Sequence, residues 1–492
     1  MDEQVAIAGV SPKQQPGFRY LMRNRNFALL WSGQLVSEIG NRFHWVAVSL
    51  WIYAQTQSAA AVSLAVSSMF VGSLLVSLWA GAFVDRFNRR SILIASDLIR
   101  ACLVILIPVL FDLSLWLVYI DLAFISIATA FSRPAIFSMI PQIVERKALM
   151  SANSFFTAME TGTEILGPIA AGFLAEAHGY APLLYADGFT YLFSALCVIG
   201  MRLEIHSPAA KFNAQALWKD VVNGLQYIRQ DALQRGLFVL IFPTTLVGAG
   251  LNALQTPLAK GEIRVTDAQF GTFQSVWGLG FLVASLILGW YGSTFRKSSI
   301  ILAGYFVGFT ATAAMGVSRE LLTLLVTAFV VGFSNTLYYV GLGTVLMEYT
   351  PSNLIGRVVS TRQVALASVR IASPLVFGGL AESIGIRLGI LLMTAIGTVM
   401  TLIAVWRFPI VRRFDEGSGT KRSGIAGAIL VDPVDPEFHP GPQRILNLAC
   451  VVIAVLTWAG VAVIRGEAAF LLAVALALAT AGSLLKRWGW LP

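Results

Sequence analysis

The stretch FHWVAVSLWIYAQTQSAAAVSLAVSSMFVGSLLVSLWAGAFV occupies residues 43–84 and contains no Asp, Glu, Lys or Arg. About 20 consecutive apolar residues are enough for one helix to cross the hydrocarbon core of a bilayer. Polar residues from Gln55 to Ser58 divide the stretch, so it predicts two membrane-spanning helices joined by a short turn.

Working outward from this stretch, the same pattern recurs along the chain. Further uncharged runs cover residues 236–259, 268–295, 298–318, 321–347 and 388–406. The composition agrees, because 57% of the 492 residues are hydrophobic, only 12% are charged and the mean hydropathy is +0.74. These values exclude an ordinary soluble protein and predict an all-α polytopic membrane protein.

Two six-helix bundles followed by a transmembrane hairpin describe the predicted organisation. Gly, Pro and acidic residues after Arg413 indicate a flexible linker, and two more uncharged runs follow it. The eleventh span is expected over 362–384. An amphipathic helix on the inner surface is predicted between the bundles, because apolar residues recur at helical spacing at Leu217, Val221, Leu225 and Ile228. The predicted segments are 1–26, a cytoplasmic N-terminal segment; 27–202, the first bundle; 203–235, a linker; 236–413, the second bundle; 414–443, the flexible linker; and 444–492, the hairpin.

Basic residues lie in alternate connections between the predicted spans. The net charge is +9, and the basic residues that share one side include Arg19, Arg23, Arg146, Lys147, Arg296, Lys297, Arg357, Arg362, Arg412 and Arg413. By the positive-inside rule both termini are cytoplasmic, which predicts a multi-pass protein of the bacterial inner membrane. In a membrane protein this charge pattern indicates the lipid bilayer as a partner, and no nucleic acid is expected.

An internal repeat links the two bundles. Residues 172–179, GFLAEAHG, correspond to residues 378–385, GGLAESIG, and Pro168 corresponds to Pro374, all at an offset of 206. Gly81 corresponds to Gly289 at an offset of 208. Duplicated bundles with a substrate site between them are typical of secondary transporters.

The motif GAFVDRFNRR at residues 81–90 follows the pattern G-x-x-x-D-R-x-x-R-R between the second and third spans. It resembles the loop motif of the major facilitator superfamily, and the resemblance covers roughly residues 18–413. The pairs Gly40-Asn41, Arg133-Pro134, Ala152-Asn153 and Gly167-Pro168, together with Asp97-Leu-Ile-Arg100, are similar to the drug/proton antiporter branch that contains macrolide efflux pumps and the enterobactin exporter.

The resemblance implies a proton-coupled exporter that alternates between inward-open and outward-open states. Some residues depart from the family pattern. Asn41 stands where many relatives carry an acid, Ser293 replaces the motif acid in the second half, and the arginine-glutamine motif of the fourth helix is not recognisable.

Ionisable residues at membrane depth are the candidates for proton coupling, because such groups are costly in lipid and commonly functional. Glu38 and Arg42 share one helix face, as do Glu160 and Glu164. The glutamates either carry protons or are neutralised by basic partners: Arg42 within the helix for Glu38, another helix for Glu160 and Glu164. His44 is either a fourth coupling residue, since histidine is a common proton-carrying side chain, or structural.

Gating and substrate binding are assigned to other residues. The gating candidates are Gly81, Asp85, Arg86, Arg89, Arg90, Asp97 and Arg100, of which the last two are equally compatible with a structural pair. The substrate-binding candidates are Gln34, Asn41, Trp45, Asn252, Gln255 and Tyr338, since buried amides need partners and aromatic rings suit a bulky molecule.

We therefore expect a secondary-active transporter that exports a lipophilic or amphipathic, drug-like small molecule in exchange for protons. The alternatives are a siderophore or metabolite exporter, and a lipid flippase or membrane sensor that makes helix contacts through its C-terminal hairpin. No Walker motif, nucleophile elbow or metal-ligand spacing occurs in the sequence, and Cys102, Cys197 and Cys450 lie in apolar segments. No enzymatic activity, catalytic residue, cofactor or metal is expected.

Overall fold

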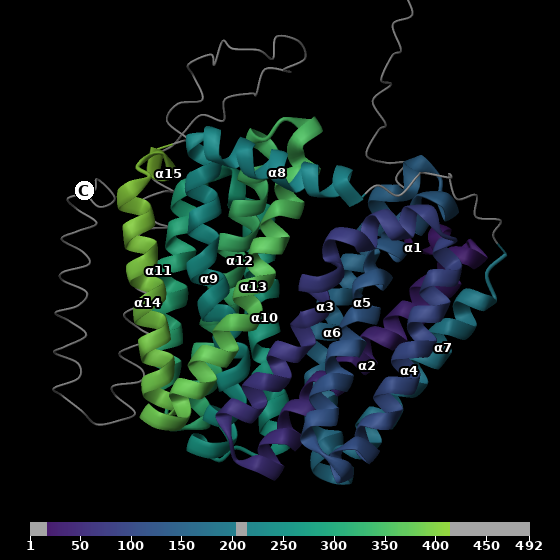
Figure 1. Ribbon diagram of the computed structural model, residues 1–492, viewed down its shortest axis with the longest axis horizontal. Coiled ribbons are helices and arrows are strands. Elements are labelled where there is room, and N and C mark those ends of the chain that lie inside the picture. Colours follow the sequence, from purple (N-terminus) through teal and green to yellow (C-terminus); the bar gives the residue numbers. More distant parts are fainter. Residues whose placement is uncertain (1–16, 203–213, 414–492) are drawn as a thin grey trace, which may run out of the picture.

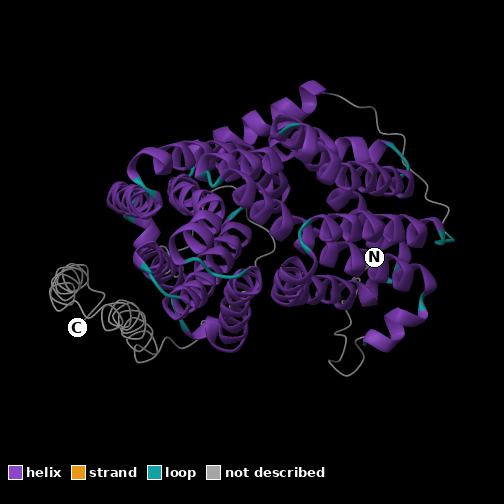
Figure 2. Cartoon of the chain, turned by 90° about the horizontal axis from the view of Figure 1, so that it is seen from below, coloured by secondary structure: helices purple, strands orange, loops and turns teal. Residues whose placement is uncertain are grey.

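The computed structural model describes residues 17–202 and 214–413, and within these residues every regular element is helical (Figure 1, Figure 2). The predicted C-terminal hairpin lies outside the described residues. In the first half the helices are α1 (Phe18–Arg23), α2 (Arg25–Thr56), α3 (Ala59–Arg86), α4 (Arg89–Leu113), α5 (Leu115–Ile143), η2 (Arg146–Ala148), α6 (Leu149–His178) and α7 (Ala181–Ile199).

A linker helix and the second half follow. They comprise α8 (Ala214–Gln230), α9 (Ala232–Pro257), the π-helix η3 (Leu258–Ile263), α10 (Asp267–Tyr291), η4 (Gly292–Thr294), α11 (Lys297–Val317), α12 (Leu321–Tyr349), α13 (Ser352–Ile384), α14 (Ile386–Arg407) and α15 (Ile410–Arg413). In Figure 1, α1, α8 and α15 lie at the same end of the molecule, which we call the α8 end. The opposite ends of the long helices form the far end.

Local sequence signals fix several helix starts. The side chains of Asn24, Asn88 and Asp231 accept hydrogen bonds from backbone N–H groups in the first turns of α2, α4 and α9. Thr266 and Gln269 form a complete capping box at the start of α10. These contacts satisfy N–H groups that have no partner within the helix, so each of these helices begins at a defined residue.

The two halves use the same helix pairings. In the first half α2 packs against α6 and α7, α5 packs against α3 and α4, and α4 also packs against α7. In the second half the corresponding pairs are α9 with α13 and α14, α12 with α10 and α11, and α11 with α14. Helices that occupy corresponding places in the two halves therefore pack against corresponding partners, as the sequence repeat implies.

Two glycines of the repeat show this symmetry at the level of the backbone. Gly179 follows α6 with φ +79°, and Gly385 follows α13 with φ +90°. Their backbone N–H groups donate to the carbonyl oxygens of Ala175 and Ala381, respectively. Because positive φ is accessible to glycine at little cost, both helices end at the same point of the repeat.

The halves meet through two equivalent pairs of helices, α6 with α10 and α3 with α13. The linker helix α8 also packs on α13, where Thr361 Oγ1 donates to the Val221 carbonyl oxygen at 3.1 Å. Ile228 of α8 is 2% exposed in a cluster with Leu346 and Val358. Part of the apolar face of α8, from which a surface helix was predicted, thus packs against helices of the second half.

Ten helices in the described chain are long and apolar enough to cross a membrane, so the protein is a multi-pass membrane protein. The helices α2 and α6 are as long but do not reach the same hydropathy, and they carry Glu38, Arg42, Glu160 and Glu164. Charged groups within the membrane-spanning part of a helix are costly, so these four residues are candidates for a functional role.

The eleventh long helix of the bundles differs from its predicted bounds. Helix α13 begins at Ser352 and not near residue 362, so Arg362 lies inside the helix and not in a connecting loop. The apolar pattern alone missed this start, because the first turns of α13 are polar and pack against α8.

At the α8 end, α1 is tied to the connection between α5 and α6. Tyr20 Oη donates to Glu145 Oε1 at 2.7 Å, and Lys147 Nζ lies 2.8 Å from Glu145 Oε2. The hydrogen bond from Lys147, reinforced by that from Tyr20, holds the pKa of Glu145 below its ordinary value.

Candidate functional site

One pair of contacts closes the far end between α3 and α13. Glu382 Oε1 accepts hydrogen bonds from Ser58 Oγ at 2.5 Å and from the backbone N–H of Ala60 at 3.0 Å. Nearby, a Cβ atom on Gly378 would overlap with Ser63 Oγ. The glycine therefore lets α13 approach α3 closely, and the carboxylate caps the first turn of α3.

The equivalent contact joins α6 and its following loop to α10. Glu176 Oε2 accepts from the backbone N–H of Ala268 at 2.8 Å, and Tyr180 Oη donates to Asp267 Oδ2 at 3.0 Å. A Cβ atom on Gly271 would overlap with the Pro168 carbonyl oxygen. Both contacts lie at the far end, so the two halves are joined there by backbone-to-backbone packing and by carboxylates at helix starts.

A charged cluster lies at membrane depth where the halves face each other. Arg133 of α5 and Glu160 of α6 form an ion pair through Arg133 Nη2 and Glu160 Oε1. Glu38 of α2 interacts electrostatically with Arg42, Glu160 and Arg133. Tyr339, on α12 of the second half and 67% exposed, interacts electrostatically with Arg133. Residues of both halves therefore contribute to one polar region, which we call the central cluster (Glu38, Arg42, Arg133, Glu160 and Tyr339).

The depth of this cluster follows from helix geometry. At about 1.5 Å per residue, Glu38, Arg133 and Glu160 lie roughly 15 to 20 Å from the α8 end of their helices. A hydrocarbon core is about 30 Å thick, so these groups lie near its middle. The predicted intrahelical ion pair between Glu38 and Arg42 is not among the ion pairs of the described residues. Arg42 Nε is buried without a hydrogen-bond partner in the described structure, and Gly167 leaves space for the Arg42 side chain.

A second polar network is buried inside the first half. Asp97 and Arg100 of α4 form an ion pair and are 0% and 3% exposed. The Arg100 guanidinium lies 4.3 Å from the ring centroid of Tyr191, whose hydroxyl donates to Asn41 Oδ1. This arrangement links α4, α7 and α2 through one ion pair, one cation–π contact and one hydrogen bond.

His44 belongs to the same interior. Its Nδ1 lies 3.4 Å from Oδ2 of Asp187, which is 0% exposed. The close approach of α2 and α7 needs Gly40, because a Cβ atom there would overlap with Thr190 Oγ1. Asp121 of α5, also buried, interacts electrostatically with His44. The network therefore includes carboxylates from α5 and α7.

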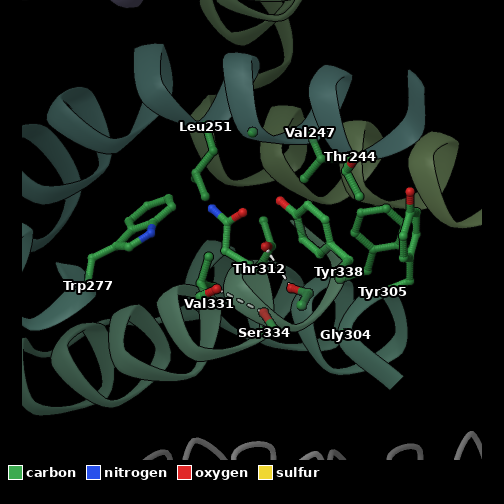
Figure 3. Close-up of a pocket in the computed structure, with 14 residues that line it drawn as sticks. Thr244, Val247, Leu251, Trp277, Gly304, Tyr305, Thr312, Val331, Ser334 and Tyr338 are labelled. Atoms are coloured by element: carbon green, nitrogen blue, oxygen red, sulfur yellow. Dashed lines mark hydrogen bonds between the residues drawn. The ribbon is translucent and has the colours of Figure 1, made fainter. Parts of the chain in front are cut away.

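An aromatic pocket lies in the second half between α9, α10, α11 and α12 (Figure 3). It has an empty volume of about 350 Å³, which includes space open to solvent. Trp277 lies at one end of the pocket in Figure 3, and Tyr338 lies beside Tyr305 at the other, with ring centroids 5.3 Å apart. None of the fourteen lining residues is charged, so the pocket offers aromatic surface and a few hydroxyl and amide groups. Such a lining is typical of sites for apolar small molecules.

The predicted substrate-binding residues lie in different places. Tyr338 lines the aromatic pocket, whereas Asn41 accepts from Tyr191 and Gln34 donates to Ser194 Oγ at 3.0 Å inside the first half. Gln255 Oε1 is buried without a partner in the described structure, and its Nε2 donates to the carbonyl oxygen of Asn252. Trp45 is half-buried against the main apolar core.

Of the predicted gating motif, Gly81, Asp85 and Arg86 lie in α3, with side chains outside the described part of the structure. Arg89 and Arg90 begin α4. Arg90 Nε donates to the Val198 carbonyl oxygen at 3.0 Å, so its positive charge lies at the C-terminal end of α7. Such a position is favourable because the last carbonyl groups of a helix carry partial negative charge.

Sequence reasoning did not assign a site role to Arg133, Asp187 or Arg370. The sequence left open whether the carboxylates of α6 have a basic partner on another helix. The structure supplies one, because Arg133 of α5 pairs with Glu160. Asp187 and Arg370 could have been identified from the sequence, since each is a charged residue within a long apolar stretch of helix.

The comparisons with known proteins agree with the fold. The sequence profile of the Major Facilitator Superfamily matches residues 30–258 and 232–491. The chain belongs to the major facilitator superfamily. The protein is therefore a membrane transporter. The second match to the family profile extends past residue 413, where the second bundle was predicted to end.

Among curated relatives of this superfamily chain, macrolide efflux protein A of Streptococcus pyogenes is 25% identical over 396 residues, covering 77% of this chain and 94% of the relative. The multidrug resistance protein MdtG of Enterobacter lignolyticus is 23% identical over 385 residues, covering 75% and 89%. The crystal structure of a point mutant of the nucleoside transporter NupG matches with a TM-score of 0.63 at 12% identity, covering 78% of this chain and 100% of that one. The structural likeness supports the fold alone.

Proposed function

We propose that the protein is a secondary-active exporter, which moves a lipophilic or amphipathic, drug-like small molecule out of the cell in exchange for protons. The observation that carries this proposal is the central cluster, where Glu38 and the Arg133–Glu160 ion pair lie at membrane depth and Tyr339 of the second half interacts electrostatically with Arg133. The names of the relatives support the direction of transport, since they are efflux and multidrug resistance proteins.

Glu38 and Glu160 are the proposed proton carriers. Glu38 forms no ion pair within the described residues, so protonation neutralises it without breaking a contact. Protonation of Glu160 releases the guanidinium of Arg133 from its partner. Glu164, whose side chain packs near Gly278 of α10, is the proposed third carboxylate because it lies at the contact between the halves. Each carrier takes up one proton from outside and releases it inside as the substrate leaves.

Alternating access is the proposed motion. The contacts at the far end join the halves through α3 with α13 and α6 with α10, and each pair has glycines at its closest approach. Breaking these contacts while the α8 end closes exposes the central cluster to the other side of the membrane. The motif at residues 81–90, with Asp85 and its arginines, is the proposed gate at the α8 end. We propose that this end and both termini are cytoplasmic, in a bacterial inner membrane.

Transport by the full chain in proteoliposomes tests the proposal. Uptake into these proteoliposomes is measured for a panel of uncharged, cationic and anionic dyes with and without an imposed pH gradient. The proposal expects at least one dye to accumulate against its gradient only when the pH difference is present. A matched control uses Glu348→Gln, which removes a carboxylate from the α8 end, where Glu348 pairs with Lys297. Flux that follows the dye gradient alone in every case would contradict proton antiport.

A further inference from the structure

Two arginines on α13 have no acidic partner in the described structure. Arg362 and Arg370 are half-buried, and at about 1.5 Å per residue they lie roughly 15 and 27 Å into the helix from the α8 end. Other arginines of the described structure have acidic partners. The ion pairs are Arg100 with Asp97, Arg133 with Glu160, and Arg387 with Glu262. The described part of the second half thus carries two positive charges at membrane depth without a counter-charge.

The electrostatic neighbours of these arginines in the described structure are tyrosines. Arg362 interacts electrostatically with Tyr305 and Tyr339, and Arg370 interacts with Tyr339. Tyr339 also faces Arg133, so the two arginines border the region that contains the central cluster. Of the acids proposed to carry protons, Glu38 and Glu160 have Arg42 and Arg133 as their first electrostatic partners in the described structure, and Glu164 packs near Gly278 of α10. A half-buried guanidinium at membrane depth without a counter-charge is costly, so its presence indicates a partner that the described residues do not supply.

Arg362 also has an electrostatic neighbour in the lining of the aromatic pocket. Tyr305 is the electrostatic neighbour of Arg362 and lines the pocket together with Tyr338 and Trp277. A molecule with an apolar ring system in the pocket therefore has a positive charge next to one end of it. Guanidinium groups bind carboxylate, sulfonate and phosphate oxygens through paired charge-assisted hydrogen bonds.

We propose that the transported molecule is a lipophilic organic anion. Its apolar part lies in the aromatic pocket, and its anionic group is bound by Arg362 and Arg370. The inference rests on the proposed exporter function and narrows its substrate class. The two arginines are binding residues and take no part in the proton path through Glu38 and Glu160.

Binding of two xanthene dyes tests the charge preference apart from transport. Fluorescein, an anion at neutral pH, and rhodamine 123, a cation on a similar ring system, are titrated against the full chain in uncharged lipid nanodiscs by fluorescence polarisation. The wild type is expected to bind fluorescein about tenfold more tightly than rhodamine 123, in line with one charge-assisted contact. Arg362→Gln and Arg370→Gln are each expected to weaken fluorescein binding about tenfold and to leave rhodamine 123 unchanged.

Two further variants separate charge from structure. Arg362→Lys and Arg370→Lys keep the positive charge and should retain most fluorescein binding. Arg407→Gln removes a positive charge from the end of α14, where Arg407 lies over the ring of Phe408, and should change neither dye. Equal weakening of both dyes by the glutamine variants, or no weakening, would overturn the inference. Anion-selective binding that depends on both arginines, without pH-driven transport, would uphold the inference and contradict the exporter.

Discussion

Glu176 and Glu382 make the same contact on opposite sides of the interface between the halves. Glu382 accepts the backbone N–H of Ala60 at the start of α3, and Glu176 accepts that of Ala268 at the start of α10. The two glutamates are separated by the repeat offset of 206, and the two alanines by 208. Each half therefore supplies one carboxylate that caps a helix of the other half, at the end where the partial positive charge of that helix is exposed.

Removing both carboxylates should loosen the far end. In the double variant Glu176→Gln, Glu382→Gln, the starts of α3 and α10 each lose a charged acceptor. We therefore expect a larger population of the state in which the two halves are separated at the far end. Cysteines placed in the contact between α6 and α10 should then react about two to five times faster with a water-soluble maleimide. Glu262→Gln is the matched control, because Glu262 pairs with Arg387 within the second half and should leave the rate unchanged. Equal rates in the double variant and the wild type would show that the two carboxylates do not hold the far end closed.

A side chain at Gly271 should prevent closure of the far end. A Cβ atom there would overlap with the Pro168 carbonyl oxygen, so Gly271→Val cannot keep α6 and α10 at their present distance. Spin labels at the far ends of these helices should show a longer mean separation. Gly289→Val lies on the same helix with nothing within 4 Å of the added Cβ and should leave the distance unchanged. An unchanged separation in the Gly271 variant would show that this contact does not control the state.

The buried network of the first half should be structural. Asp97→Asn leaves the guanidinium of Arg100 buried without its counter-charge, which costs about 3–5 kcal/mol of folding stability. We expect a clearly lower thermal unfolding midpoint in detergent. Asp112→Asn, an exposed position on the same helix, is the control. A midpoint equal to wild type, together with loss of transport, would instead assign the pair to the gate.

The apolar runs predicted the helical membrane fold, because each membrane-spanning helix is recorded in one continuous stretch of sequence, and the repeat predicted two related halves. The segments that match at an offset of 206 contain the glycines that end α6 and α13 and the glutamates that cap the partner half, but the match alone did not assign these roles. The ion pairs were harder to predict. His44 meets Asp187 and Arg133 meets Glu160 only after different helices pack together, so helix spacing carries no signal for these pairs. Spacing instead favoured a pair between Glu38 and Arg42, but the Arg42 side chain packs in the space beside Gly167.

Truncation after Gly417 should leave a folded transporter. The predicted hairpin follows two complete halves that already make all the contacts described between α3, α6, α10 and α13. We expect measurable flux, with an altered unfolding midpoint or oligomeric state. The full chain measured in the same liposomes is the reference. A truncated protein that unfolds at the same temperature but transports nothing would make the hairpin part of the mechanism.

Proton movement in step with substrate is the most direct measurement of the central proposal. The full chain in liposomes that contain a pH-sensitive dye is given a transported compound, and the protons moved per substrate are counted for the wild type, Glu38→Gln, Glu160→Gln and the Glu348→Gln control. An amide does not titrate in this pH range, so we predict coupled proton flux in the wild type and the control, and downhill substrate flux without protons in at least one of the other two variants. Proton movement per substrate that is unchanged in both Glu38→Gln and Glu160→Gln would contradict a proton path through the central cluster.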